Sequence, residues 1–103
     1  MRIVENFTKT ITREEVQYKY SYRLTEIDFY GASAYGIEIE RKDYINNMLV
    51  NIERDSVEKI SCYLEKVQKL TNMLYVYEVS PIHLIDIIGE YVDEYVNDFN
   101  QCA

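Results

Sequence analysis

The residues of this chain best suited to binding or chemistry are acidic, and they gather near the C-terminus. Residues 75–103 carry six Asp and Glu residues and no Lys or Arg. Residues 1–74 carry 12 acidic and 11 basic residues, so nearly all of the net charge of −7 lies in the last segment. At 100° per residue, a helix there places most of its polar residues on one arc. The candidate partner-binding residues are Asp86, Glu90, Asp93, Glu94 and Asn97.

An acidic helix face has two interpretations, and the sequence leaves both open. It can be a solvated surface that keeps a small protein soluble. It can also dock a basic partner, or imitate the phosphate charges of a nucleic acid. Direct binding of nucleic acid is not expected, because contacts to phosphates need clustered Lys and Arg.

Few residues are suited to catalysis. The only histidine, His83, is spaced with Asp86 and Glu90 so that one helix face could hold a divalent metal, but metal sites usually draw ligands from several elements. Cys62 and His83 could form a nucleophile–base pair, yet no group that would orient the histidine is identifiable. The chain has no glycine-rich phosphate loop and no Cys-x-x-Cys pair. We therefore expect no enzyme activity, no metal and no cofactor.

The two cysteines, Cys62 and Cys102, stand 40 positions apart. A small secreted domain normally carries more disulfides than one such pair supplies. We therefore expect two free thiols in a reducing, cytoplasmic compartment. No apolar run approaches the roughly 20 residues that a membrane-spanning helix needs, so no contact with a membrane is expected.

Eleven tyrosines are the second unusual feature of the composition. Tyr18, Tyr20 and Tyr22 alternate with polar residues and share one face of a predicted strand. Exposed aromatic rows on a sheet can stack single-stranded bases. This row, however, shares its face with Val16 and Leu24, so we expect it to form core beneath the helices, with its phenol groups near the rim.

The elements that position these residues follow from the hydrophobic period, which is 2 in the first half of the chain and 3.6 in the second. Short links favour antiparallel neighbouring strands. Asp55, with Glu58 three residues later, predicts the start of one helix. Ser80 followed by Pro81 predicts the start of the next. We expect strands at about 2–12, 16–29, 34–41 and 47–53, and helices at about 56–75 and 81–99.

The expected fold is one α+β domain of residues 1–103. It is a two-layer sandwich, in which two helices pack on one face of a four-stranded antiparallel meander. The other face of the sheet carries Glu38 and Glu40 and should be exposed to water.

Three segments of the chain are similar to known sequences. They are residues 35–40 (YGIEIE), residues 50–52 (VNI) and residues 79–88 (VSPIHLIDII), of which the start of the last is the most specific. Through them the chain resembles an uncharacterised family of short proteins from clostridial-type bacteria. The resemblance implies a bacterial cytoplasmic protein of no known activity, and it transfers no catalytic or binding residues.

These observations favour a small non-enzymatic regulatory or adaptor protein that acts through protein–protein contact at the acidic helix face. A second copy of the chain is one candidate partner, because so small a core can leave a sheet edge or a helix margin uncovered. The alternative is an acidic decoy that occupies the nucleic-acid-binding groove of another protein. A third interpretation is a small-molecule-binding module with a tyrosine-lined gap between sheet and helices.

Overall fold

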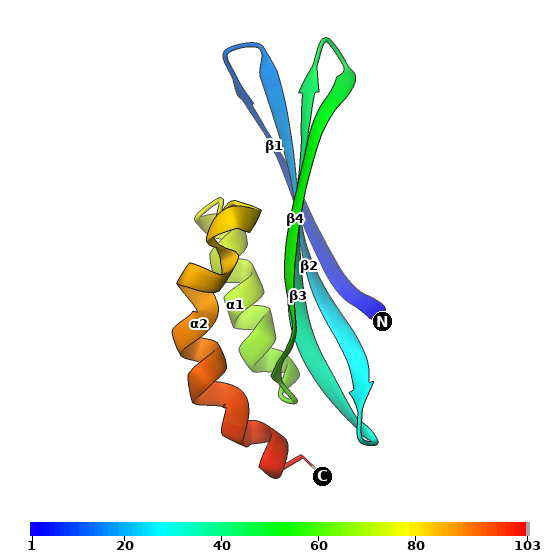
Figure 1. Ribbon diagram of the computed structural model, residues 1–103, viewed down its shortest axis with the longest axis vertical. Coiled ribbons are helices and arrows are strands. Elements are labelled where there is room, and N and C mark those ends of the chain that lie inside the picture. The colour runs from blue at the N-terminus through cyan, green and yellow to red at the C-terminus, as the bar shows by residue number, and fades with distance from the viewer. Residues whose placement is uncertain (103) are drawn as a thin grey trace.

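The computed structural model describes residues 1–102 and shows a four-stranded antiparallel sheet followed by two helices (Figure 1). Each strand pairs with the next along the chain, so the sheet is a meander. The predicted α+β architecture is confirmed. The elements are β1 (Arg2–Arg13), β2 (Val16–Phe29), β3 (Ala32–Ile45), β4 (Met48–Ser61), α1 (Leu64–Val76), a 3₁₀ turn η1 (Pro81–His83), α2 (Leu84–Tyr95) and a second 3₁₀ segment η2 (Val96–Asn100).

Each of the three hairpins closes through two residues with positive φ. Glu14 and Glu15 join β1 to β2, Tyr30 and Gly31 join β2 to β3, and a pair of asparagines joins β3 to β4. Two consecutive residues of this kind form the turn whose twist matches that of antiparallel strands. The turns thereby fix the register of the strands, which decides which side chains share a face.

The boundary between the sheet and α1 differs from the prediction. The sequence predicted that a helix begins at 56, with Asp55 and Glu58 as its capping residues. Instead, both residues lie within β4, and α1 begins at Leu64. Asp55 pairs with Ile39 of β3, which is itself longer than the predicted 34–41. Pairing along the whole edge of β3 outweighs a local capping signal, because backbone groups left unpaired inside the fold cost free energy.

The predicted helix at 81–99 is divided into three parts. Pro81 begins η1 rather than an α-helix, α2 covers the central 12 residues, and η2 forms the last turns. Ser80 precedes Pro81 as predicted, but its side chain makes no capping hydrogen bond. The helix tightens to a 3₁₀ form where Asp98 bonds to Ser61 and Lys66.

The core lies between the helices and one face of the sheet. Tyr22 is completely buried, and its hydroxyl donates a hydrogen bond of 3.0 Å to the carbonyl oxygen of Val79. The prediction that Tyr20 and Tyr22 form core is confirmed, whereas Tyr18 is only half-buried. The other fully buried large side chains include Leu24, Ile37, Ile39, Ile60, Val67, Leu74, Leu84 and Ile88.

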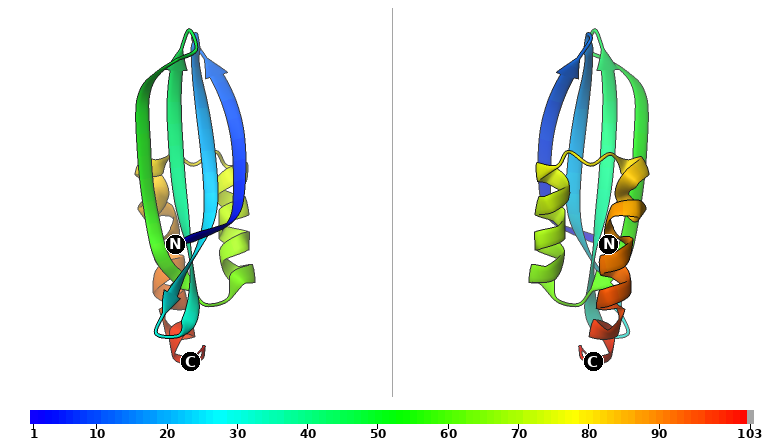
Figure 2. Two further views of the ribbon diagram at one scale, coloured as in Figure 1. Left: turned by 90° about the vertical axis from the view of Figure 1, so that its right-hand side faces the viewer. Right: turned by 90° about the vertical axis from the view of Figure 1, so that its left-hand side faces the viewer.

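The helices cover the width of the sheet but only part of its length (Figure 1, Figure 2). A 14-residue strand extends roughly 46 Å, whereas the 13 residues of α1 rise roughly 20 Å. The two hairpin ends that join β1 to β2 and β3 to β4 therefore project beyond the helices. The molecule is accordingly elongated, with Cα extents of 50 × 24 × 17 Å.

Polar side chains cover the projecting sheet where no helix does. Arg41 bonds to the Asp43 carboxylate at 2.9 Å, and the Asn51 amide donates to the same carboxylate at 3.0 Å. The Arg41 guanidinium also lies over the Tyr18 ring, 5.4 Å from its centroid. Asp43 is buried as a result, and this part of the sheet is closed by a charged network rather than by apolar packing.

Candidate functional site

All five predicted partner-binding residues are exposed. Asp86, Glu90, Asp93 and Glu94 belong to α2, and Asn97 lies in η2. We call these five residues the acidic face. Within residues 1–102, none of them takes part in an ion pair or a side-chain hydrogen bond. Their charge and their hydrogen-bonding capacity are therefore available to a partner.

The carboxylates of the sheet contrast with the acidic face, because many of them are paired. Glu40 is only 4% exposed and is contacted by Arg54, by Arg23 at 3.1 Å and by Lys42 at 3.7 Å. Burial alone raises the pKa of the Glu40 carboxyl, but hydrogen bonds from Arg54 and Arg23 outweigh it and hold the pKa below its ordinary value. The prediction that Glu38 and Glu40 are exposed to water is wrong, because the arginine side chains lie over them.

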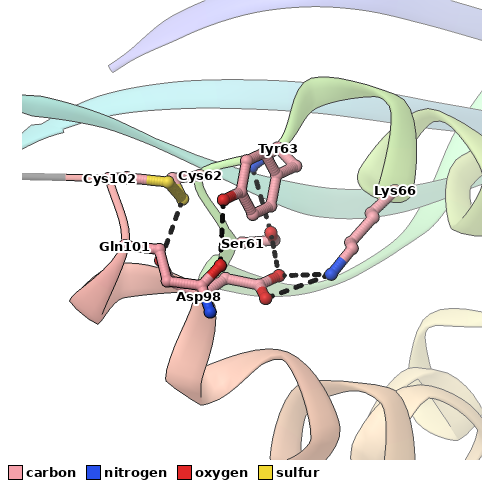
Figure 3. The surroundings of a disulfide bond; sticks show 7 residues. All are labelled: Ser61, Cys62, Tyr63, Lys66, Asp98, Gln101 and Cys102. Atoms are coloured by element: carbon pink, nitrogen blue, oxygen red, sulfur yellow. Dashed lines mark hydrogen bonds and ion pairs between the residues drawn. A yellow bond between two sulfur atoms is a disulfide. The ribbon is translucent and has the colours of Figure 1, made fainter.

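Asp98 belongs to the same C-terminal segment but has a structural role. Its carboxylate accepts a hydrogen bond of 2.7 Å from the Ser61 hydroxyl and two bonds, of 2.8 and 3.0 Å, from the Lys66 ammonium (Figure 3). Burial by itself raises the pKa of Asp98, but the bonds from Lys66 and Ser61 lower it below its ordinary value. Asp98 therefore anchors η2 to the end of β4 and to α1.

The cysteines correct a second prediction, since Cys62 and Cys102 form a disulfide rather than two free thiols (Figure 3). Their Cα atoms are 6.3 Å apart, within the range that a disulfide spans. Cys62 follows β4 directly, and Cys102 follows η2. The fold brings the two together because Asp98 already fixes η2 beside Ser61, a contact that sequence separation alone does not reveal.

An open apolar groove lies beside the acidic face, between β4 and the outer side of α2. Its volume is about 410 Å³, and its lining residues are Val57 of β4 and Ile85, Ile88, Gly89, Val92 and Asp93 of α2. Sequence reasoning missed this groove because it assigned Val57 to a helix. The spacing of Ile85, Gly89, Val92 and Val96, which stand four, three and four residues apart, was the available signal. It marks a second apolar stripe that runs along α2 and ends at the first residue of η2.

Comparison with protein families shows which family the chain belongs to. The model of the family of unknown function DUF6514 matches residues 1–94. The chain belongs to this family. The matched region contains the whole sheet, α1 and every residue of the acidic face except Asn97. The predicted resemblance to an uncharacterised family is thus confirmed. Comparison with curated proteins found no match, and comparison with solved structures found none either.

The other residues considered for chemistry are not assembled into a reactive group. His83 is exposed in η1, and Cys62 is bonded to Cys102 instead of facing a base. Across residues 1–102, no group of three or more His, Cys, Asp or Glu side chains has the arrangement that a metal ion needs. No helix in this part of the chain is long and apolar enough to cross a membrane.

The gap between sheet and helices, considered as a small-molecule site, is filled by side chains. Tyr20 and Tyr22 stack there with ring centroids 6.1 Å apart, and Tyr75 packs edge-on against Tyr22 at 5.9 Å. Because the Tyr22 hydroxyl already bonds to Val79, these rings serve packing. We make no proposal for a ligand in this gap.

Proposed function

We propose that this protein is a small non-enzymatic adaptor or regulatory protein that binds a basic segment of another protein through the acidic face. The observation that carries the proposal is the contrast between two sets of carboxylates. Those of Glu40 and Asp98 are paired with Arg or Lys, whereas the acidic face has no counter-charge. A basic partner would supply the missing charges, and their summed field would speed its approach.

Apolar residues beside the acidic face support binding over a purely solvating role. Ile82, Ile85 and Ile87 are exposed on or next to the same helix. A surface that only keeps a protein in solution gains nothing from exposed isoleucines, whereas interfaces combine an apolar centre with a charged rim. We therefore expect the partner segment to be both basic and amphipathic.

The test is affinity capture with a charge-reversed variant. Asp86, Glu90 and Asp93 are replaced together by Lys in one variant, and the exposed Glu14, Glu15 and Glu65 in a matched control. Both variants change the net charge equally, and surface substitutions of this kind usually alter stability by less than about 0.5 kcal/mol each. Proteins captured by the parent and by the control, but not by the acidic-face variant, are the expected partners.

Equal capture by all three proteins would contradict the proposal and leave the acidic face as a solvated surface. Equal loss of captured proteins with both variants would also contradict the proposal, because binding would then depend on net charge alone. Circular dichroism and the melting temperature of each variant establish that the fold is retained.

A second candidate function uses the same residues as a decoy for nucleic acid. Asp86, Glu90 and Asp93 form a row with steps of roughly 6 and 4.5 Å along α2, and residues 75–102 contain no Lys or Arg to interrupt the charge. For a decoy, DNA or RNA should displace this protein from the captured partner, and binding should weaken steeply with added salt. An adaptor that binds elsewhere on its partner would not be displaced.

A cytoplasmic location forms part of the proposal and can be tested through Cys62 and Cys102. In the cytoplasm the thiol pool opposes stable disulfides, so the Cys62–Cys102 bond that the structure contains should be opened by reduction in most molecules there. Trapping of free thiols with a maleimide in intact cells, followed by electrophoresis, measures the reduced fraction. A fully oxidised pair would contradict the cytoplasmic location.

A further inference from the structure

The flank formed by the edge of β4 and the outer side of α2 is an uncovered apolar surface. We call it the β4/α2 flank and define it by Val57, Ile85, Gly89, Val92 and Val96. Figure 1 looks directly onto it. β4 is the last strand of the sheet and pairs only with β3, so its outer edge has no strand partner. Ile85 is 58% exposed and Val96 57% exposed, so the two ends of the flank are open, whereas Val57, Gly89 and Val92 at its centre are half-buried.

The stripe on α2 is complementary to itself when a second helix runs antiparallel to it. In an antiparallel pair centred between Gly89 and Val92, Ile85 lies opposite Val96 of the second copy, and Gly89 lies opposite Val92. A Cβ atom added at Gly89 would meet no atom within 4 Å, so Gly89 leaves a notch on this side of the helix. The Val92 side chain of a second copy has the size to fill that notch. Residue spacing of four, three and four is also that of helices that pack side by side.

The position of β4 is compatible with the two-fold symmetry that relates the two helices of such an antiparallel pair. Val57 lines the groove together with Gly89 and Val92, so the strand and the helix have their central residues at one level of the flank. One two-fold axis perpendicular to the sheet can therefore pass through the centres of both layers. Because β4 departs from regular pairing with β3 next to Val57, we expect side-chain contact between the two strands rather than one continuous ladder.

The charges of β4 favour a second copy at this position. Its flanking residues have both signs, with Glu53 and Asp55 beside Arg54, and Glu58 beside Lys59. With the axis level with Val57, Asp55 lies opposite Lys59 of the second copy, and this pair has opposite charges. Of the acidic face, only Asp93 lies at the contact, because it lines the groove, whereas Asp86, Glu90, Glu94 and Asn97 point away from the sheet.

We infer that two copies of this chain associate through the β4/α2 flank. A standard interface takes about 800 Å² from each partner. The accessible surface of the whole chain is 6472 Å². The side of the molecule that contains the flank has Cα extents of 50 × 24 Å, so this side is large enough to supply such an area. In the dimer the flank is covered, and the two acidic faces join into one wider surface on the helix side.

Asp93 gives the association a distinctive response to salt. Its carboxylate lines the groove close to the proposed axis, so the Asp93 side chains of two copies come near each other. Their repulsion adds to the one between two chains that each carry a net charge of −7. Together the two repulsions outweigh the attraction between Asp55 and Lys59, and salt screens them. Added salt should therefore strengthen self-association, whereas it should weaken the binding of a basic partner to the acidic face.

Sedimentation velocity of the oxidised protein tests the inference. We expect the parent to form dimers with a dissociation constant on the order of micromolar. Gly89→Gln fills the notch and should raise this constant at least tenfold. The variant folds, because the site is open in the monomer and Gln favours a helix more than Gly does. Ile87→Gln, which changes an exposed residue on the other side of α2, is the control and should leave the constant unchanged.

A second pair of variants tests the location of the axis. Asp93→Asn should strengthen dimers at low salt, whereas Glu94→Gln, which removes the same charge away from the groove, should have little effect. Four outcomes would overturn the inference: a parent that stays monomeric at about 200 µM, equal effects of Gly89→Gln and Ile87→Gln, equal effects of Asp93→Asn and Glu94→Gln, or dimers that weaken as salt is added. Because Gly89→Gln leaves the acidic face intact, failure here does not affect the proposed adaptor function.

Discussion

Gly36 of β3 is the residue at which the sheet tolerates no side chain. β4 leaves regular pairing opposite it, and the carbonyl groups of Val57 and Glu58 approach its Cα so closely that a Cβ atom would collide with them. Those atoms are backbone and cannot move aside without shifting β4. The glycine therefore permits the irregularity that turns β4 toward the start of α1.

Gly36→Ala should lower the free energy of unfolding by about 1–3 kcal/mol, the usual cost of overpacking a well-packed site. Gly89→Ala is the matched control, because it adds the same methyl group at a helical position with open space. That control should be neutral or stabilising by up to about 1 kcal/mol. Urea denaturation at low protein concentration measures both, and equal effects would refute the steric explanation.

Glu40 makes stability depend on acid pH. Its folded pKa lies below the ordinary value of 4.5, so the unfolded chain binds more protons as the pH falls. The stabilising contribution of the Glu40 carboxylate is fully present above the pKa that Glu40 has in the unfolded chain. It is lost as the pH falls through the pKa that Glu40 has in the folded protein. Glu40→Gln should lower the free energy of unfolding by about 1–3 kcal/mol at neutral pH, and it should make the loss of stability between neutral pH and about pH 3 shallower. The exposed Glu58→Gln should leave the pH profile unchanged.

At the scale of elements, the three hairpins differ in how well their residues suit positive φ. The turn between β2 and β3 contains Gly31, which adopts φ of 82° without steric cost, whereas Glu14 and Glu15 adopt 50° and 71°. A side chain with a Cβ atom loses roughly 1–2 kcal/mol in this conformation. The long strands hold the glutamates in place, since β1 and β2 pair over nearly their full lengths.

Replacing Glu14 and Glu15 together by Asn and Gly should raise the free energy of unfolding by about 1 kcal/mol, because this pair suits the turn. Tyr30→Asn in the neighbouring turn, which already has its glycine, should give a smaller gain. Thermal denaturation of the two variants compares them directly. A decrease in melting temperature for the first variant would show that the glutamates stabilise the turn in another way.

For the whole molecule, the Cys62–Cys102 disulfide joins the end of the sheet to the end of the helical half. The chain between them contains both α1 and α2, so the bond constrains the complete helical layer in the unfolded state. Closing a loop of 40 residues typically stabilises a protein by about 2–4 kcal/mol. Because Asp98 also anchors η2 through Ser61 and Lys66, the fold itself should survive reduction.

Reduction by an excess of dithiol should therefore lower the free energy of unfolding by about 2–4 kcal/mol and leave the circular dichroism spectrum largely unchanged. The double variant Cys62→Ser and Cys102→Ser should match the reduced parent and should not respond to the reductant. Loss of helical signal on reduction would instead show that the disulfide, and not Asp98, holds the helical layer on the sheet.

Features that depend on a local period could be predicted from the sequence. The alternation in residues 16–24 predicted a half-buried strand whatever its neighbours, because successive side chains of any strand face opposite sides. The apolar spacing of Val67, Leu70 and Leu74 puts them on one side of any helix, and this is the buried side of α1. The carboxylates of α2 were predicted to share one arc in the same way. These features needed only the geometry of one element.

Features that depend on contacts between distant residues could not be predicted in this way and became visible in the folded chain. β4 extends through Asp55 because the edge of β3 offers it partners, and a capping motif carries no information about that edge. Glu40 is buried because Arg54, on the neighbouring strand, lies over it. Cys62 can bond to Cys102 only because the helical half folds back along the sheet. For the same reason Val57 lines one groove together with residues of α2. The acidic face could thus be predicted from the sequence, whereas the groove beside it could not, because it forms only where two elements far apart in the chain come together.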